Sequence, residues 1–536
     1  MQHAPLAQWF DQADMNDTST VGGKGASLGE MFQKLTTIGV KVPNGFTLTT
    51  EAFHRFITAD IPEATWKNVG APEEVDDLRR AAIEKTTLRD ALEVCLRDAD
   101  PTDHLNLNSR AALARSLVRE TPVPESIKSA IAAEYGKLCE MYSPGVDVAV
   151  RSSATTEDSA DASFAGQYES YLNVSGEQDI IEKWRRCVAS MFTERAIGYH
   201  LEHNMHPLDS AIAVVVMKMA RSDKGSSGVM FTIDPDSGHE GVIHIGSSYG
   251  LGELVVQGVV SPDTFTVWKE GLRQGKFPVV HRTLGSKDQM MVYHEEAANE
   301  VQSIAVPFED RRRWSLSKEE CVELARMALN IEDYFQRPMD IEWAKDGITG
   351  ELYIVQARPE TIHSKAHSSK MTIYKIDEIM AQQLKDDGRV MATGQAVGKR
   401  IGGGKVRLYR TYGEVLEGKR ELRKMLDSGM SRQEISPELS VFDEGDVLVT
   451  EMTTPDWEPL MKQASLIITR KGGRTSHAAI IAREFGIPAI VGCSDAMDLP
   501  NFAHITGSCA EGDVGYVYSG DVPFEIEEVS FDESLE

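Results

Sequence analysis

The chain has 536 residues, 41% of them hydrophobic and 26% charged, a composition typical of a globular enzyme with roughly three or four domains. Its formal charge of -27 repels a phosphate backbone, so we expect no nucleic-acid partner. No stretch reaches the roughly 18 consecutive apolar residues of a membrane helix, and the first residues lack a signal sequence. The cysteines lack the spacing of a zinc site or of a disulfide framework. We therefore expect a cytoplasmic protein without a membrane partner.

A glycine-rich segment near the N-terminus is the first candidate binding element. Residues 21 to 30 read Val-Gly-Gly-Lys-Gly-Ala-Ser-Leu-Gly-Glu, and a helix-like stretch from Met31 to Thr37 and a strand-like stretch from Val40 to Thr47 follow. A glycine pair followed by lysine is either a phosphate-facing loop, with Lys24 on the phosphate, or a structural turn. The segment is not a Walker A sequence, so these residues alone leave both interpretations open.

After a polar, helical region from about residue 62 to 131, a buried strand at 146 to 150 leads into an arginine beside small hydroxyl residues. Arg151 and Ser152 follow the strand directly, and Gly166 lies in the next small-residue segment, Ser-Phe-Ala-Gly-Gln-Tyr. A guanidinium is a rigid fork of donors for phosphate oxygens, and glycine allows close backbone approach. We interpret this region as a polyphosphate site, with an ordinary polar loop as the alternative.

Two strands, Met339 to Ala344 and Leu352 to Arg358, flank a turn and predict a hairpin. Period-two alternation puts Asp340, Glu342, Gln356 and Arg358 on one face, and Ile341, Trp343, Tyr353 and Val355 on the other. Carboxylate and amide oxygens can bind Mg²⁺ while the guanidinium neutralises charge on a transferring phosphoryl group. A surface salt bridge from Arg358 to Asp340 or Glu342 is the alternative.

Residues 466 to 492 hold the candidate nucleophile. A buried strand, Leu466 to Thr469, runs into Gly472 and Gly473, and apolar residues at helical spacing follow, so His477 falls in the first turn of a helix. The positive end of the helix dipole disfavours a cationic imidazolium and attracts anions. A neutral, nucleophilic histidine that can hold a phosphoryl group is therefore expected, with a core or capping histidine as the alternative.

The run from Gly472 to Gly492, Gly-Gly-Arg-Thr-Ser-His-Ala-Ala-Ile-Ile-Ala-Arg-Glu-Phe-Gly-Ile-Pro-Ala-Ile-Val-Gly, resembles the phosphohistidine signature of the phosphoenolpyruvate synthases and pyruvate phosphate dikinases. The glycine-rich segment, the Val-Arg-Ser-Ser-Ala-Thr region, Asp-Ile-Glu-Trp and Gln-Ala-Arg-Pro-Glu resemble further motifs of that family. The resemblance extends from about Trp9 to Tyr518. One departure is Met217, where the family usually has a glutamine that contacts adenine or ribose.

The resemblance implies a role for each matching residue. His477 would be the phosphoryl carrier, with Arg358 also catalytic, and Glu342 and Gln356 would bind Mg²⁺. Thr475 would correspond to the threonine that regulatory kinase/phosphorylases modify in the family. The residues implied in ATP binding are Lys24, Arg151, Ser152, Gly166, Glu253 and Arg358.

The implied fold is α/β (α+β), an ATP-grasp-like domain followed by a swivelling β/β/α phosphohistidine domain. We predict an ATP-binding domain at 1–361, a hinge at 362–385, a phosphohistidine domain at 386–522 and a loose acidic tail at 523–536. In the full synthases a TIM barrel of roughly 250 residues follows, which binds pyruvate and Mg²⁺. We identify no acceptor site here and therefore expect a short form or a donor chain with a separate acceptor subunit.

By resemblance, the expected activity is that of a pyruvate, water dikinase. The β-phosphoryl group of ATP ends on histidine, the γ-phosphoryl group is released by water, AMP leaves, and the phosphohistidine swings to pyruvate. One alternative is a phosphohistidine donor for another acceptor, and a second is a non-catalytic ATP-binding regulator. A regulatory kinase/phosphorylase and a second copy of the chain are further conceivable partners.

Overall fold

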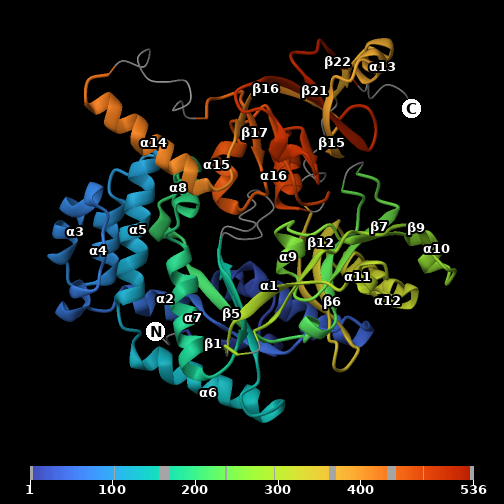
Figure 1. The fold of residues 1–536 in the computed structure, drawn as a ribbon. Helices are drawn as coiled ribbons and strands as arrows, with labels where there is room; N and C mark the ends of the chain where they lie inside the picture. Colours follow the sequence, from blue (N-terminus) through green and yellow to red (C-terminus); the bar gives the residue numbers. More distant parts are fainter. Residues whose placement is uncertain are drawn as a thin grey trace.

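The structure is a computed structural model, and it describes residues 4–101, 103–155, 168–235, 238–294, 296–297, 299–360, 370–430, 442–474 and 476–530. Helices and strands alternate through the described residues, which confirms the predicted mixed α/β class. The N-terminal two thirds hold two large antiparallel sheets and one two-stranded sheet, and a closed barrel follows toward the C-terminus (Figure 1).

The first sheet has five strands in the order β1-β2-β5-β3-β4. They are β1 (Ala7–Trp9), β2 (Gly45–Leu48), β3 (Val148–Ala154), β4 (Ser170–Val174) and β5 (Ile212–Lys218). Helices cover one face: α2 (Thr50–Ile57), α3 (Asp76–Ile83), α4 (Leu88–Leu96), α5 (His104–Glu120), α6 (Glu125–Met141), α7 (Glu177–Ser190) and α8 (Glu194–Glu202). Alternation along β5 turns Val214 and Val216 toward these helices and Val215 and Met217 toward the second sheet.

The second sheet has six strands in the order β13-β12-β6-β7-β8-β9. They are β6 (Ser226–Phe231), β7 (Val242–Tyr249), β8 (Asp263–Trp268), β9 (Val279–Thr283), β12 (Met339–Lys345) and β13 (Leu352–Pro359). Around it lie α9 (Glu253–Val256), α10 (Lys269–Arg273), α11 (Phe308–Arg311), α12 (Lys318–Phe335) and the hairpin of β10 (Gln289–Tyr293) and β11 (Val301–Ala305). Its apolar side packs against α1 (Thr18–Lys34), α12 and Met217, so Met217 lies in the core between the sheets.

The C-terminal barrel closes in the order β15-β19-β18-β17-β16-β20-β21. Its strands are β15 (Val390–Val397), β16 (Ile401–Leu408), β17 (Val447–Thr450), β18 (Leu466–Thr469), β19 (Ala489–Val491), β20 (His504–Ser508) and β21 (Val514–Ser519). The helices of this part are α13 (Glu378–Asp386), α14 (Tyr412–Asp427), α15 (Glu458–Met461) and α16 (His477–Phe485). In Figure 1 the barrel lies above both sheets, with α14 close to α5.

Two expectations about local structure were wrong. The glycine-rich segment is part of helix α1, which is kinked at Gly22. Glycine has a low helix propensity, but here the packing of the helix against its neighbours outweighs it. A Cβ on Gly29, for example, would lie 2.2 Å from the Ala13 carbonyl oxygen. The acidic tail is not loose from Glu525 to Ser530, where β22 (Glu525–Ser530) pairs with β14 (Lys370–Lys375). Lys375 and Glu527 form an ion pair of 2.6 Å across these strands.

Candidate active site

The hairpin β12–β13 brings four of the predicted polar residues together. Its register pairs Asp340 with Arg358 and Glu342 with Gln356, and directly opposed residues lie on the same face of a sheet. The prediction that these four side chains share a face is therefore confirmed. The prediction that Tyr353 shares the opposite face with Ile341 and Trp343 was wrong, because a β-bulge after Glu342 makes Trp343 pair with Ile354. The packed face consequently carries Leu352 and Ile354 beside Trp343, and not Tyr353.

The bulge has a consequence for Arg151. Val355 is the extra residue of the bulged strand, and a bulge leaves such a residue out of the regular ladder. The Val355 carbonyl accepts a hydrogen bond of 2.8 Å from Nη1 of Arg151. The guanidinium is thus held against the hairpin by a main-chain carbonyl at the bulge of β13, which is an edge strand of the sheet.

Arg151 also bridges the two predicted metal ligands. Its Nη2 donates to Oε2 of Glu342 at 2.7 Å and to Oε1 of Gln356 at 2.8 Å. Burial would raise the pKa of Glu342, but the charges of Arg151, Lys24 and Arg358 hold it below its ordinary value. Glu342 is therefore an anion in this setting, and its carboxylate converges with the Gln356 amide oxygen on one cationic position.

Lys24 reaches this region from helix α1. Its Nζ donates to the Ser152 carbonyl at 3.2 Å, so the glycine-rich segment and the strand of Arg151 are in contact, as the phosphate-site interpretation requires. Gly22 has φ +71°, and a Cβ there would lie 2.0 Å from the Ser153 carbonyl oxygen. The Gly25 N–H donates to Ser153 Oγ at 3.0 Å. Only glycine fits position 22, and it allows the helix to lie against β3.

Arg358 is held by Asp340 through two hydrogen bonds, from Nε at 2.9 Å and from Nη2 at 2.7 Å. Burial raises the pKa of Asp340, although Arg358 acts in the opposite direction. The fork geometry of this pair fixes the orientation of the guanidinium, and the same planar group can bind phosphate oxygens. The structure thus contains the salt bridge that was considered as an alternative, and the bridge orients an arginine beside Glu342.

Of three further predicted residues, the structure describes one, Glu253. Glu253 is the first residue of α9, where its Oε1 accepts from Gln257 Nε2 at 2.9 Å. Burial raises its pKa. Gly166 lies outside the described residues, and so does Thr475.

His477 is the first residue of helix α16, as predicted, and follows strand β18 through the glycine pair. Ser476 is the N-cap, and its side chain accepts from the Ala479 N–H. Gly472 has φ +103°, in the region that favours glycine. The helix ends at Gly486, with φ +66°, a left-handed C-cap. The N-cap Ser476 and the C-cap Gly486 fix the two ends of this short helix. His477 therefore lies at its start, shortly after barrel strand β18.

The two ring nitrogens of His477 have different surroundings. Nδ1 lies 3.1 Å from Thr453 Oγ1, whereas Nε2 is buried and has no hydrogen-bond partner among the residues that the structure describes. A buried N–H without a partner is more costly than an unused lone pair, so we assign the proton to Nδ1, which donates to Thr453. Nε2 then carries the free lone pair. Burial, together with the charge of Arg195, lowers the pKa of His477 to about 3, so the imidazole is neutral.

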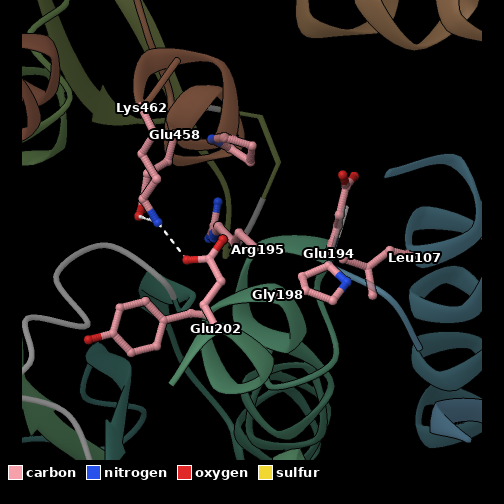
Figure 2. A pocket seen from close by; sticks show the side chains of 10 residues that line it. Leu107, Glu194, Arg195, Gly198, Glu202, Glu458 and Lys462 are labelled. Atoms are coloured by element: carbon pink, nitrogen blue, oxygen red, sulfur yellow. Dashed lines mark hydrogen bonds and ion pairs between the residues drawn. The ribbon is translucent and has the colours of Figure 1, made fainter. Parts of the chain in front are cut away.

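Arg195 belongs to α8 in the N-terminal part of the chain, and the sequence analysis did not find it. Its Nη1 lies 3.2 Å from Oδ1 of Asp456, which precedes α15. A second ion pair of 2.9 Å joins Lys462 to Glu202. Figure 2 shows Arg195 and Glu202 on the helix that faces Glu458 and Lys462, around a small cavity between the two parts of the chain.

A tighter contact joins the histidine loop to the segment after α9. Gly258 has φ +71°, and a Cβ there would lie 2.1 Å from the Cβ of Ser476. A Cβ on Gly473 would lie 3.7 Å from Cδ of Pro262. The histidine loop therefore rests on Gly258 and Pro262, which belong to the N-terminal part of the chain.

Arg474 follows the glycine pair of the histidine loop, and its planar guanidinium could donate to phosphate oxygens. Its Nη2 donates to Asp513 Oδ1 at 2.6 Å, and this interaction lowers the pKa of Asp513. The local sequence pattern around His477 gives no signal for these distant partners, which are Thr453, Arg195, Gly258 and Asp513. Only the fold brings them together.

Comparison with known proteins places this geometry in a family. Residues 18–378 match the family model described as pyruvate phosphate dikinase, AMP/ATP-binding domain, and residues 442–512 match that of the PEP-utilising enzyme, mobile domain. No helix within the described part of the chain combines the length and apolarity needed to cross a membrane.

Three proteins named phosphoenolpyruvate synthase illustrate the similarity. The one from Synechocystis sp. is 42% identical over 98% of this chain and 58% of its own length, and the one from Escherichia coli is 42% identical over 98% and 59%. The Pyrococcus furiosus protein is 35% identical over 96% of this chain and 58% of its own length. The chain spans less than two thirds of these relatives. Since the first family model covers more than half of the chain, the chain belongs to the pyruvate phosphate dikinase AMP/ATP-binding domain family.

Proposed function

We propose that this chain carries out the ATP and histidine half-reaction of a dikinase of the phosphoenolpyruvate synthase type. The observation that carries the proposal is the state of His477, whose Nδ1 is engaged by Thr453 and whose neutral ring leaves Nε2 as a lone-pair nucleophile. That histidine rests on the N-terminal part of the chain, which matches the ATP-binding family model. The contact between Gly258 and Ser476 supports a transfer from a donor site in that part of the chain to His477.

In the proposed reaction, Nε2 forms a bond to the β-phosphorus, and the bond from that phosphorus to the oxygen shared with the α-phosphorus breaks. AMP leaves with the bond electrons, so the histidine first carries the β- and γ-phosphoryl groups together. Water then attacks the γ-phosphorus, the bond from that phosphorus to the oxygen shared with the β-phosphorus breaks, and orthophosphate leaves. ATP, water and histidine thus give AMP, phosphate and phosphohistidine. Positioning and charge neutralisation supply most of the catalysis in phosphoryl transfer.

The residues of this chain divide that work as follows. Lys24, Arg151 and Arg358 neutralise the phosphate oxygens, and Asp340 orients Arg358. Ser152, Gly166 and Glu253 line the nucleotide site in this proposal. Thr453 fixes the tautomer and the ring plane of His477, and burial together with the charge of Arg195 keeps the imidazole neutral. Thr475 is proposed as the regulatory residue.

Glu342 and Gln356 would hold Mg²⁺. Their oxygens converge on the Nη2 group of Arg151, which shows that the two ligands can face one cation, and Mg²⁺ commonly uses one or two protein ligands besides water and phosphate. When bound, the ion would neutralise charge on the phosphate oxygens and orient them. With the ion bound, Arg151 would donate to the nucleotide in place of Glu342 and Gln356.

We further propose pyruvate as the acceptor, because the curated relatives are named phosphoenolpyruvate synthases. The acceptor site is proposed to lie outside the residues described above, in a further part of the polypeptide or on a separate subunit. The division into an ATP-binding unit at 1–361, a hinge at 362–385 and a phosphohistidine unit at 386–522 is part of the same proposal. Reorientation of the second unit would carry the phosphoryl group from one site to the other.

The test is formation of an acid-labile, base-stable phosphoenzyme from ATP labelled in the β position. Wild-type protein with Mg²⁺ should incorporate the label, and His477→Asn should not, because no nucleophile remains at that helix start. His504→Asn removes an exposed histidine of the same barrel and serves as the control, which should label normally. Equal labelling of His477→Asn and wild type would refute the proposal.

A further inference from the structure

The second sheet contains an ion pair that is withdrawn from solvent and plays no part in the proposed chemistry. Lys287 and Asp263 form a salt bridge, and both side chains are 0% exposed. Taking two charges out of water costs free energy that the pair itself seldom recovers, so a fully buried pair is weak evidence for a stabilising role. A hydrophobic pair of similar size could fill the same space. This pair therefore calls for a reason other than stability.

Every polar atom of the pair is used. Oδ1 of Asp263 accepts from Lys287 Nζ and from the Gly285 N–H, while Oδ2 accepts from the N–H and the Oγ of Ser315, each at 2.8 Å. Lys287 Nζ also donates to the Gly285 carbonyl at 3.0 Å. Such a network has one geometry, because any shift leaves a buried charge without a partner.

The network also fixes the backbone just before Asp263. The Lys287 N–H donates to the Ser261 carbonyl at 3.2 Å, and Lys287 has φ +41°, which is uncommon for a residue with a side chain. A Cβ on Gly285 would lie 2.3 Å from the carbonyl carbon of Pro262, so the loop between β9 and β10 lies directly on residues 261 and 262. The ion pair holds Lys287 in its left-handed conformation and thereby presses residues 285 to 287 against Ser261 and Pro262.

That segment is the one on which the histidine loop rests. Gly258 contacts Ser476, the N-cap of the histidine helix, and Pro262 lies near Gly473, where an added Cβ would be 3.7 Å from Pro262 Cδ. At its other end the segment is tied to α9, because the Gly258 N–H donates to the Val255 carbonyl at 3.0 Å and Val260 is buried beside Leu254. We name residues Gly258–Pro262 the histidine seat.

We propose that the buried Asp263–Lys287 pair is a positioning device that fixes the histidine seat and so sets the rate at which a phosphoryl group passes from ATP to His477. This inference rests on the proposed function. Neither residue touches the nucleotide or the imidazole in our account. Direct transfer needs a reacting geometry within about 3–3.5 Å, and a displacement of about 1 Å can cost about 100-fold in rate.

The first experiment neutralises both partners together. Asp263→Asn with Lys287→Met removes both charges and avoids leaving one of them buried alone. We expect the single-turnover rate of phosphohistidine formation from ATP to fall by about 100-fold while the Kd for ATP stays within about twofold of wild type. The matched control is Lys269→Met with Glu332→Gln, a pair of 2.6 Å at the other end of β8, which should leave the transfer rate unchanged.

A second readout separates positioning from damage to the histidine itself. Phosphoramidate is a small phosphoryl donor that reaches His477 without docking on the ATP-binding part. The double variant should be labelled by phosphoramidate at least as fast as wild type, although it is labelled slowly by ATP. Slow labelling by both donors would overturn the inference, and so would a transfer rate from ATP equal to that of the control pair.

A third variant tests the seat without touching the ion pair and serves if the double variant does not fold. Gly258→Ala puts a Cβ into Ser476, whereas Gly275→Ala has a similar φ, +66°, with nothing within 4 Å of the added Cβ. Only Gly258→Ala should slow transfer from ATP, and equal rates in the two variants would overturn the inference. If wild-type protein itself forms no phosphohistidine from ATP, the proposed function fails and this inference fails with it.

Discussion

Thr453→Val tests the assignment of Nε2 as the nucleophile of His477. The substitution keeps the size of a side chain that is only 2% exposed but removes the hydroxyl that contacts Nδ1 at 3.1 Å. Loss of one neutral hydrogen bond costs about 1 kcal/mol, which corresponds to about fivefold in rate. A buried Nδ1–H left without a partner costs up to about 3 kcal/mol, or about 150-fold, and favours the tautomer whose proton sits on Nε2.

We therefore expect the single-turnover rate of phosphohistidine formation to fall between about fivefold and 150-fold, with the Kd for ATP unchanged. Thr453→Ser keeps the hydroxyl and should restore most of the rate. Thr454→Val, at the next position, whose side chain makes no capping hydrogen bond to the following 3₁₀ helix, is the matched control. A folded Thr453→Val protein that transfers within twofold of wild type would refute the assignment.

Two other predictions concern the metal and the charge of the histidine. Glu342→Gln should raise the Mg²⁺ concentration for half-maximal phosphohistidine formation by about tenfold or more, because a carboxylate ligand is lost; an unchanged Mg²⁺ titration would remove Glu342 from the metal site. Since burial and Arg195 lower the pKa of His477 to about 3, from an ordinary 6.5, histidine-selective NMR should detect no protonation of this ring between about pH 5 and 8. The contribution of this neutral ring to the free energy of unfolding is fully present above pH 6.5 and is lost as the pH falls toward 3. A titration midpoint near 6.5 for this ring in the folded protein would contradict its burial.

The sequence predicted the local parts of the site well because their signals are local. The strand, the glycine pair and the helix period around His477 fix its place at a helix start whatever lies around it. The alternation in the hairpin likewise put Glu342 and Gln356 on one face. Each of these predictions depends on residues a few positions apart.

The errors came where tertiary packing overrides local preference. The β-bulge at Val355 reverses the expected facing of Tyr353, since one extra residue shifts a period of two. The segment around Lys24 is helical because Gly29 must lie against Ala13, which propensity does not reveal. Strand β22 in the expected tail forms only because a partner strand far along the chain lies beside it.

Other parts of the site could not be found from a single sequence at all. Thr453 and Arg195 approach His477 through the fold, and Gly258 meets Ser476 across the two parts of the chain. The spacing of these residues along the chain carries no periodic signal. Their chemistry follows only from distances and burial.

The central claim is that His477 takes the β-phosphoryl group of ATP while the γ-phosphoryl group leaves as phosphate. The most direct measurement is a single turnover of this protein with Mg²⁺ and ATP labelled either in the β or in the γ position, followed by acid-free peptide mapping. The account predicts β label on the peptide that contains His477, γ label in orthophosphate, and AMP in an amount equal to the phosphohistidine. Label from the γ position that remains on the protein after the turnover is complete, or ADP as the nucleotide product, would contradict it.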